Sequence, residues 1–299
     1  MANAFPNPEL LWHAEHELAE ADYDEVLKRV SDFKGTVAPL SGGLANHSFL
    51  LNDDRVLRIY RRDKRTLVRE RQLLTREWQH CRVPQIYDGG DDYLLLEFVP
   101  HGPLQNSIEH GSAAGSALAE IHSFRFDAHG EFGDSLQVEQ PWEDFPTAIV
   151  DYIQSSELKT AVDQELVRSL VHFVSDRTHL LRKSCQQAVL LHGDFKPSNL
   201  HWTCDDRLLV LDWEFTYAGP SLMDIGQLFR FDFPEPFRTT FVDSYQNGDG
   251  SLPADWESRC RIFDLVNLVG LLAKSEPMSH RADDCRRRIE LTLRNSRPT

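Results

Sequence analysis

The sequence predicts an α+β protein of two lobes, a small antiparallel-sheet lobe over residues 1–98 and a larger, mainly helical lobe over residues 99–299. Up to residue 98, short apolar runs alternate with turn residues, which is the pattern of strands and hairpins. Beyond it, apolar residues recur at spacings of three and four, as on one face of a helix. Of the 299 residues, 41% are hydrophobic, enough to bury a sizeable core.

The first lobe is predicted to be a small sheet with one inserted helix. Residues 8–33 carry apolar side chains at helical spacing among many acidic ones and predict an amphipathic helix. Residues 35–62 predict three strands, separated by the glycine-containing "LSGGLANHSF" and by an "NDD" turn. Residues 63–80 predict a helix, and residues 84–100 predict a hairpin that includes the apolar run "YLLLEFVP".

Helical spacing dominates the second lobe. It predicts helices within residues 112–124, 144–154 and 163–185, and from about residue 230 to the end apart from an irregular stretch. Two short apolar runs, "QAVLLHG" and "RLLVLDWE", interrupt these helices and predict two strands of a short hairpin. The hairpin would bring the polar residues at its two strand ends together.

Charge and cysteine usage narrow the classes of partner. The formal net charge of −15 disfavours nucleic acid and anionic lipid as partners, and it fits either a cationic small molecule or simple solubility. The five cysteines are scattered and never spaced as CxxC, which argues against a disulfide framework and a zinc site. The N-terminal stretch lacks the features of a signal peptide, and no run is long enough for a membrane helix. We therefore expect a cytoplasmic protein.

A polar stretch, "LLHGDFKPSNLHW" at residues 190–202, follows the first of these strands. It contains Asp194 and Asn199, and Asp212 ends the next predicted strand. Carboxylate and amide oxygens are ligands that Mg²⁺ accepts, and a carboxylate free of metal can take a proton from an attacking hydroxyl. The alternative is a polar turn whose Asp and Asn satisfy local backbone groups.

The wider pattern "HGDFKPSNL…LVLDWEFTYAGPSLMDIGQL" resembles the aminoglycoside phosphotransferase and choline kinase superfamily of small-molecule kinases. The resemblance is strongest over residues 190–226 and covers most of the chain, because other expected parts occur in the expected order. It implies a two-lobed protein-kinase-like fold, ATP and Mg²⁺ as cofactors, and a small molecule with a hydroxyl group as the phosphoryl acceptor.

The resemblance also implies roles for residues of this stretch. Asp194 would be the catalytic base, and Asn199 and Asp212 would hold Mg²⁺. His192 would brace the loop, and Lys196 would neutralise the moving phosphoryl charge or face solvent.

The nucleotide-binding residues that the resemblance implies come mainly from the first lobe. They are Ser41, Gly42, Gly43 and Asn46 of the glycine-containing hairpin, Arg58, Glu70, and the backbone around Glu97 and Val99. A glycine pair also suits an ordinary turn, and the run around Glu97 also suits a core strand.

Arg58 stands where the family usually has Lys, and Glu70 on the following helix would be its carboxylate partner. Arginine keeps the positive charge and can grip phosphate with two nitrogens, but it is larger and planar, so the exchange is not conservative. Arg58 also belongs to a run of basic residues of the kind that is often a solvated face.

Two further acidic residues follow Asp212. Glu214 replaces the Gly of the D-F-G motif, which disfavours a regulated protein kinase. Asp224 resembles a family Asp that supports the catalytic loop, or it forms a capping box with Ser221.

Candidate acceptor-binding residues are Glu214 and Asp264, because carboxylates suit a cationic acceptor and aromatic residues lie nearby in the sequence. An acceptor of this kind would be an aminoglycoside-like antibiotic, a choline-like amino alcohol or a related metabolite. The alternative function is a kinase-shaped nucleotide-binding module with little transfer activity.

Overall fold

The computed structural model describes residues 24–26, 28–30, 33–40, 46–61, 64–155, 158, 161–231, 233–276 and 279–295. Most of the helix predicted over residues 8–33 lies outside these ranges, as do Ser41, Gly42 and Gly43. Within that predicted helix, residues 24–26 are helical.

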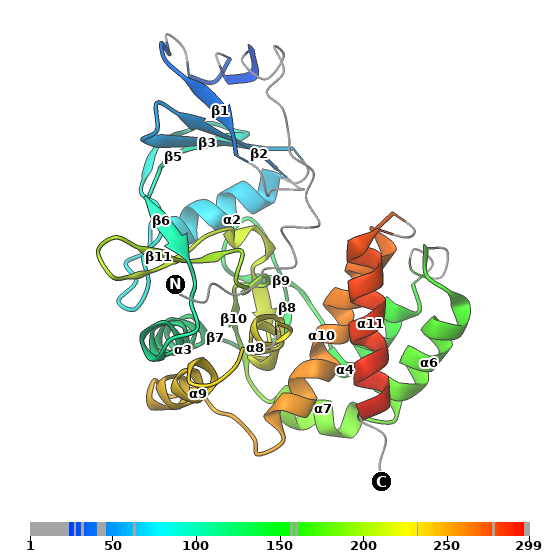
Figure 1. Ribbon diagram of the computed structural model, residues 1–299. Helices are drawn as coiled ribbons and strands as arrows, with labels where there is room; N and C mark the ends of the chain where they lie inside the picture. The colour runs from blue at the N-terminus through cyan, green and yellow to red at the C-terminus, as the bar shows by residue number, and fades with distance from the viewer. Residues whose placement is uncertain are drawn as a thin grey trace.

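The first sheet has five antiparallel strands in the order β1-β2-β3-β5-β4. Figure 1 shows β1, β2, β3 and β5 above α2. These are β1 (Val37–Pro39), β2 (Asn46–Leu51), β3 (Arg55–Tyr60), β4 (Ile86–Gly89) and β5 (Tyr93–Glu97), and α2 (Lys64–Leu74) is inserted between β3 and β4. Asn52 and Asp53 in the β2–β3 turn have φ values of 50° and 60°, which Asn and Asp tolerate better than most residues. The three strands predicted over residues 35–62 with their "NDD" turn, the hairpin predicted over residues 84–100 and the inserted helix are confirmed.

Two smaller sheets follow. One has the order β7-β10-β13-β8-β9, and the other has the order β12-β11-β6. Their strands are β6 (His101–Pro103), β7 (Arg125–Phe126), β8 (Gly130–Phe132), β9 (Val138–Pro141), β10 (Ala188–Leu191), β11 (Leu200–Thr203), β12 (Leu208–Val210) and β13 (Tyr217–Gly219).

The prediction that the runs at residues 187–193 and 207–214 pair in one hairpin is wrong. The runs do form β10 and β12, but β10 pairs with β7 and β13, whereas β12 pairs with β11. The sequence reasoning missed β11, which begins directly after Asn199 and pairs with the strand that leads to Asp212. The polar residues are therefore brought together by two neighbouring sheets and not by one hairpin.

Most of the helices lie beyond residue 100. The helices are α3 (Ile108–His122), α4 (Phe145–Ile153), α6 (Gln164–Ser175), α7 (Thr178–Ser184), α8 (Leu222–Phe229), α9 (Phe237–Asn247), α10 (Trp256–Ala273) and α11 (His280–Asn295), with a 3-10 turn, η2 (Trp213–Phe215). Helical spacing over residues 163–185 thus corresponds to two helices. Within the described ranges, no helix is both long and apolar enough to cross a bilayer.

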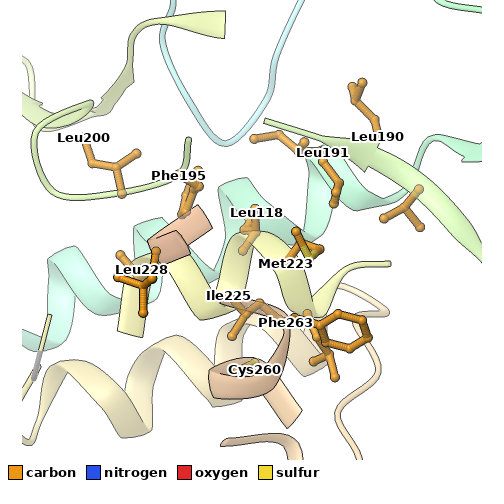
Figure 2. Close-up of a cluster of buried hydrophobic side chains, with 14 of the residues drawn as sticks. Leu118, Leu190, Leu191, Phe195, Leu200, Met223, Ile225, Leu228, Cys260 and Phe263 are labelled. Atoms are coloured by element: carbon orange, nitrogen blue, oxygen red, sulfur yellow. The ribbon is translucent and has the colours of Figure 1, made fainter. Parts of the chain in front are cut away.

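The hydrophobic core is centred on α8. Figure 2 shows Leu118 of α3, Leu190 and Leu191 of β10, Met223, Ile225 and Leu228 of α8, Cys260 and Phe263 of α10, and Phe195 packed around this helix. Phe195 is completely buried although it lies in the polar loop after β10, so it anchors that loop in the core.

The large cluster also includes residues of the first 98, such as Tyr60 and Leu67. A second, smaller cluster lies in the first sheet around Phe49 and Leu57. Because the main core spans both sides of residue 98, the division of the chain at that position stays a prediction.

Candidate active site

Asp224 holds the start of the loop that carries Asp194. Its carboxylate is fully buried and accepts hydrogen bonds from the backbone nitrogens of His192, at 2.7 Å, and Gly193, at 2.9 Å. Ser221 forms no side-chain cap to α8, so the capping box is not observed. The contacts instead match the supporting role that the resemblance implied for Asp224.

Three polar residues that the sequence reasoning missed complete this support. Gln227 accepts from the Phe195 backbone nitrogen at 2.9 Å and donates to the Gly193 carbonyl at 2.7 Å. His122 places Nε2 3.3 Å from Asp224 Oδ2 and Nδ1 2.8 Å from the Tyr245 hydroxyl. The only sequence signal was a histidine at the end of an apolar helix, a pattern that also fits an ordinary core histidine.

Gly193 and His192 fix the path of the loop. Gly193 has a φ of 80°, and a Cβ there would lie 2.0 Å from the Phe215 carbonyl oxygen, so a side chain is excluded. His192 is buried, accepts from the Asp194 backbone nitrogen at 3.2 Å and donates through Nε2 to the Leu211 carbonyl at 3.0 Å. Burial lowers the pKa of His192, so the ring is neutral and braces the loop against the residue before Asp212.

Asp194, Lys196 and Asn199 converge within the loop. Asp194 Oδ2 accepts from Asn199 Nδ2 at 2.9 Å and lies 3.1 Å from Lys196 Nζ. Asn199 Nδ2 also donates to the Asp194 carbonyl at 2.9 Å. Because the amide nitrogen is engaged in this way, the carbonyl oxygen of the Asn199 side chain is the atom left for a metal.

Asp212 follows β12 in a left-handed conformation, with φ 67° and ψ 60°. Such a conformation is uncommon outside glycine, and it is frequent at functional sites. The carboxylate contacts the Arg58 guanidinium. Burial raises the pKa of Asp212, but the charge and the hydrogen bond of Arg58, assisted by the charge of Lys196, together outweigh burial and the pKa is lowered. The Asp212 carboxylate is therefore ionised at neutral pH.

Arg58 lies among three carboxylates, one from α2 and two from the segment after β12. Its Nε is 3.5 Å from Glu70 Oε2, and one terminal nitrogen is 3.6 Å from Glu214 Oε1, in addition to the contact with Asp212. Asn46 donates to Glu214 Oε2 at 2.6 Å. The structure thus joins the predicted nucleotide-binding residues Asn46, Arg58 and Glu70 to the metal-site candidate Asp212.

Burial and neighbouring carboxylates change the pKa values of the acidic residues around Arg58. Burial, and next the charge of Asp212, raise the pKa of Glu214 to about 8. Burial likewise raises the pKa of Glu70. Arg58 compensates part of this negative charge. Although Arg58 Nε lies near Glu70, its geometry makes no hydrogen bond there, and within the described residues this buried N–H has no hydrogen-bond partner.

The donor set fits Mg²⁺ in the way that nucleotide sites use it. Within the described residues, no three His, Cys, Asp or Glu side chains form a self-contained metal cage. Mg²⁺ is commonly bound by one or two carboxylates together with water and phosphate oxygens. The Asp212 carboxylate and the Asn199 side-chain oxygen match that requirement.

Most backbone nitrogens around Glu97 are engaged in hydrogen bonds. The Glu97 nitrogen donates to the Gln85 carbonyl at 2.8 Å, and the Phe98 nitrogen donates to the Asp54 carbonyl at 2.9 Å. The Glu97 carboxylate pairs with Arg82 at 2.6 Å. As far as the chain is described, the Val99 nitrogen has no hydrogen-bond partner.

Asp264, predicted as an acceptor-binding residue, lies on α10 and faces α8. Both of its carboxylate oxygens accept from Arg230, at 2.8 and 2.5 Å, and the pair is buried. The Asp264 charge is therefore compensated within the protein. Glu214, the other acceptor candidate, faces Arg58 and Asn46.

His201 gives this region a pH dependence that can be measured. Burial, assisted by His101 with its ring centroid 4.2 Å away, lowers the pKa of His201 from 6.5 to about 4. The folded protein binds this proton less readily than the unfolded chain does. The contribution of neutral His201 to the free energy of unfolding is therefore fully present above pH 6.5 and is lost as the pH falls through 4. Between pH 7 and pH 4, we expect the free energy of unfolding to fall by about 2–3 kcal/mol less in His201→Gln than in the parent protein.

Urea unfolding between pH 7 and pH 4 checks this expectation. The exposed His179, substituted by Gln, serves as the control. Equal acid sensitivity in His201→Gln and the parent protein would contradict the assignment.

Residues 36–261 match the family model described as the phosphotransferase enzyme family. The chain belongs to this family. A solved structure of similar fold, that of a putative fructosamine-3-kinase from Thermobifida fusca YX-ER1, is 19% identical, with 91% of this chain and 98% of that chain covered and a TM-score of 0.67. A comparison with curated protein sequences found no match.

Two aminoglycoside phosphotransferases are also similar. APH(4)-Ia is 19% identical, with 94% of this chain and 100% of that chain covered and a TM-score of 0.67. The ternary complex of APH(2″)-IIa with streptomycin and ATP is 15% identical, with 92% of this chain and 97% of that chain covered and a TM-score of 0.63. The two-lobed kinase-like α+β fold predicted from the sequence is confirmed for this phosphotransferase-family chain.

Proposed function

We propose that this phosphotransferase-family protein is an ATP-dependent O-phosphotransferase that acts on a hydroxyl group of a small molecule. The observation that carries the proposal is the convergence of Asp194, Asn199 and Asp212 at the meeting point of two small sheets. Asp194 bonds to Asn199 at 2.9 Å, and the Asn199 backbone carbonyl accepts from the nitrogen of Leu211, the residue before Asp212, at 3.0 Å. Asp212 in turn contacts Arg58. This arrangement matches the needs of phosphoryl transfer, in which positioning and charge compensation dominate.

The first lobe, residues 1–98, would bind the nucleotide, and residues 99–299 would carry the catalytic loop and the acceptor site. ATP supplies the phosphoryl group, and Mg²⁺ offsets charge on the phosphates. Asn199 and Asp212 would hold the metal. Arg58 would contact the phosphates with Glu70 as its partner, and the Val99 nitrogen would be available to the adenine.

Ser41, Gly42, Gly43 and Asn46 are the residues we propose for the loop over the phosphates. Asn46 is the one that the structure describes, and it is bonded to Glu214.

Asp194 is the proposed base. Its carboxylate would accept the proton of the acceptor hydroxyl, while Asn199 and Lys196 hold it in place at 2.9 and 3.1 Å. His192 is a positioning residue, because both of its ring nitrogens are engaged within the loop and its neighbouring strand. Lys196 would also lie near the transferred phosphoryl group.

The acceptor is proposed only as a class. The similar solved structures include complexes with streptomycin and with gentamicin, a macrolide 2′-phosphotransferase and a putative fructosamine-3-kinase, all of which concern hydroxylated small molecules. Glu214 remains a candidate for contact with an acceptor. The alternative is a nucleotide-binding module with weak transfer activity, which is favoured by the position of Arg58 against Asp212.

Acceptor-dependent ADP release tests the proposal. Purified protein with Mg²⁺ and ATP is assayed against aminoglycosides, choline, ethanolamine, thiamine, homoserine, macrolides and fructosamines. Release stimulated by one class establishes the transferase and its acceptor class. ATP binding without stimulation on the whole panel favours the module, and absence of ATP binding rejects both functions.

Arg58→Lys tests whether Arg58 is an adapted phosphate ligand or a residue that lowers the activity. The guanidinium contacts three carboxylates at once, which a single ammonium group cannot reproduce with the same geometry. We expect Arg58→Lys to lower kcat/KM for ATP by about tenfold, equivalent to about 1.4 kcal/mol. Initial rates against ATP concentration measure this, with the exposed Arg55 substituted by Lys as the matched control on the same strand. Higher activity in Arg58→Lys would show that the arginine limits the enzyme.

A further inference from the structure

A cavity of about 200 Å³ lies between α8, α9, α10 and α11. Its apolar wall includes Phe229, Trp256, Cys260, Leu268 and Leu291. The rings of Phe229 and Trp256 meet edge to face, with centroids 5.3 Å apart. A cavity of about 150 Å³ is enough to bind benzene in a protein interior, so this one accepts an apolar body of about one ring.

Five guanidinium groups line the same cavity, those of Arg230, Arg238, Arg261, Arg287 and Arg288. Among the residues that the structure describes, three carboxylates compensate them: Asp264 and Glu257 in the lining, and Asp284 beside it. Counted over these described residues, five positive groups against three negative ones leave two positive charges in excess. This excess stands out because the chain as a whole carries a net charge of −15.

The carboxylates of the cavity are already engaged. Arg230 takes both oxygens of Asp264, and Arg238 lies 2.6 Å from Glu257. Arg287 and Arg288 share Asp284 at 2.7 and 2.8 Å. The acidic residues of this region suggested a cationic ligand when the sequence alone was considered. Because they are paired with arginines, they offer little free negative charge.

Arg261 and Arg238 are the groups best placed to meet a ligand. Arg261 is exposed on α10 and, within the part of the chain that is described, forms no ion pair. The Arg238 guanidinium lies 5.2 Å from the Phe229 ring centroid and 6.0 Å from that of Trp256. A cation held beside an aromatic wall suits a ligand that combines a ring with a negative group.

We propose that this cavity binds a small organic anion, composed of an apolar body of about one ring and a single carboxylate or phosphate head. The body occupies the wall formed by Phe229 and Trp256, and the head meets Arg261 and Arg238 with bidentate geometry. The site goes beyond the proposed function, since its residues differ from those assigned to the nucleotide and the metal. It lies against α8, which also carries Asp224 and Gln227, the residues that hold the catalytic loop.

Calorimetric titration without ATP tests the proposal independently of transfer activity. Benzoate, phenyl phosphate, benzyl alcohol and benzylamine share the ring and differ in the head. We expect saturable binding of at least one of the two anions, at least about tenfold tighter than that of the alcohol or the amine, with an affinity that falls as salt rises. Preference for phenyl phosphate over benzoate would identify the head as phosphate. Equal or tighter binding of benzylamine, or no saturable binding of either anion, overturns the proposal.

Substitutions locate the binding site. Arg261→Gln and Arg238→Gln are each expected to weaken binding of the preferred anion about tenfold. Arg286→Gln is the matched control, because Arg286 is a partly exposed arginine of α11 outside the cavity lining. Circular dichroism of each variant confirms that it is folded. If the anion binds equally to both cavity variants and to the control, the assignment to this cavity is rejected.

Discussion

Asp194→Asn is expected to reduce acceptor-dependent ADP release by about two to four orders of magnitude, the range that a positioned general base contributes. The amide has nearly the same shape as the carboxylate and can still accept the bond from Asn199 through its oxygen. It cannot take a proton from the acceptor hydroxyl, and it loses the ion pair with Lys196. The loss should therefore fall on kcat, with ATP affinity largely kept.

Steady-state rates and ATP titration of the same preparations measure the two quantities. The exposed Asp151 on α4, substituted by Asn, is the matched control for loss of one carboxylate. Wild-type turnover in Asp194→Asn would mean that another group accepts the proton. A parallel loss of ATP binding would mean that the substitution disturbs the loop and not the chemistry.

Asp212→Asn is expected to lower turnover by at least about a hundredfold at low Mg²⁺ concentration, since one of the two proposed metal ligands loses its charge. Asparagine tolerates the left-handed backbone of this position as well as aspartate does, so the fold should persist. Removing the Asp212 charge should also bring the pKa of Glu214 below about 8, because Asp212 contributes to that shift.

Turnover against Mg²⁺ concentration is the decisive measurement. A rightward shift of the curve, with partial recovery at high Mg²⁺, supports metal binding at Asp212. Asp206→Asn provides a close control: Asp206 also has a positive φ, of 56°, and lies in the turn between β11 and β12. An unchanged Mg²⁺ requirement in Asp212→Asn would remove Asp212 from the metal site.

Local pattern predicted most of the elements, because strand and helix periodicity depends on residues close in sequence. The strands around the "NDD" turn and the inserted helix were confirmed for this reason. Strand partners depend on residues far apart in the chain, so the pairing of β10 with β7 and β13 was not foreseen. The missed β11 is only four residues long and follows the polar loop directly, where no alternating run marks it.

The candidate site shows the same division. The order and spacing of His192, Asp194, Asn199 and Asp212 were visible in the sequence, since loop chemistry is encoded in a short segment. Their support was not visible: His122 reaches Asp224 across 102 positions, and Arg58 reaches Asp212 across 154. Each of these contacts forms only when helices and sheets pack.

The sequence by itself determined the family resemblance, the two-lobed fold class and the polar motif after β10. Tertiary structure alone decided which charges remain free. Asp264 is compensated by Arg230, whereas Arg261 keeps an unpaired charge within the described residues. The physical reason is that a side chain's charge is fixed by its type, but its compensation depends on neighbours that folding brings from other elements.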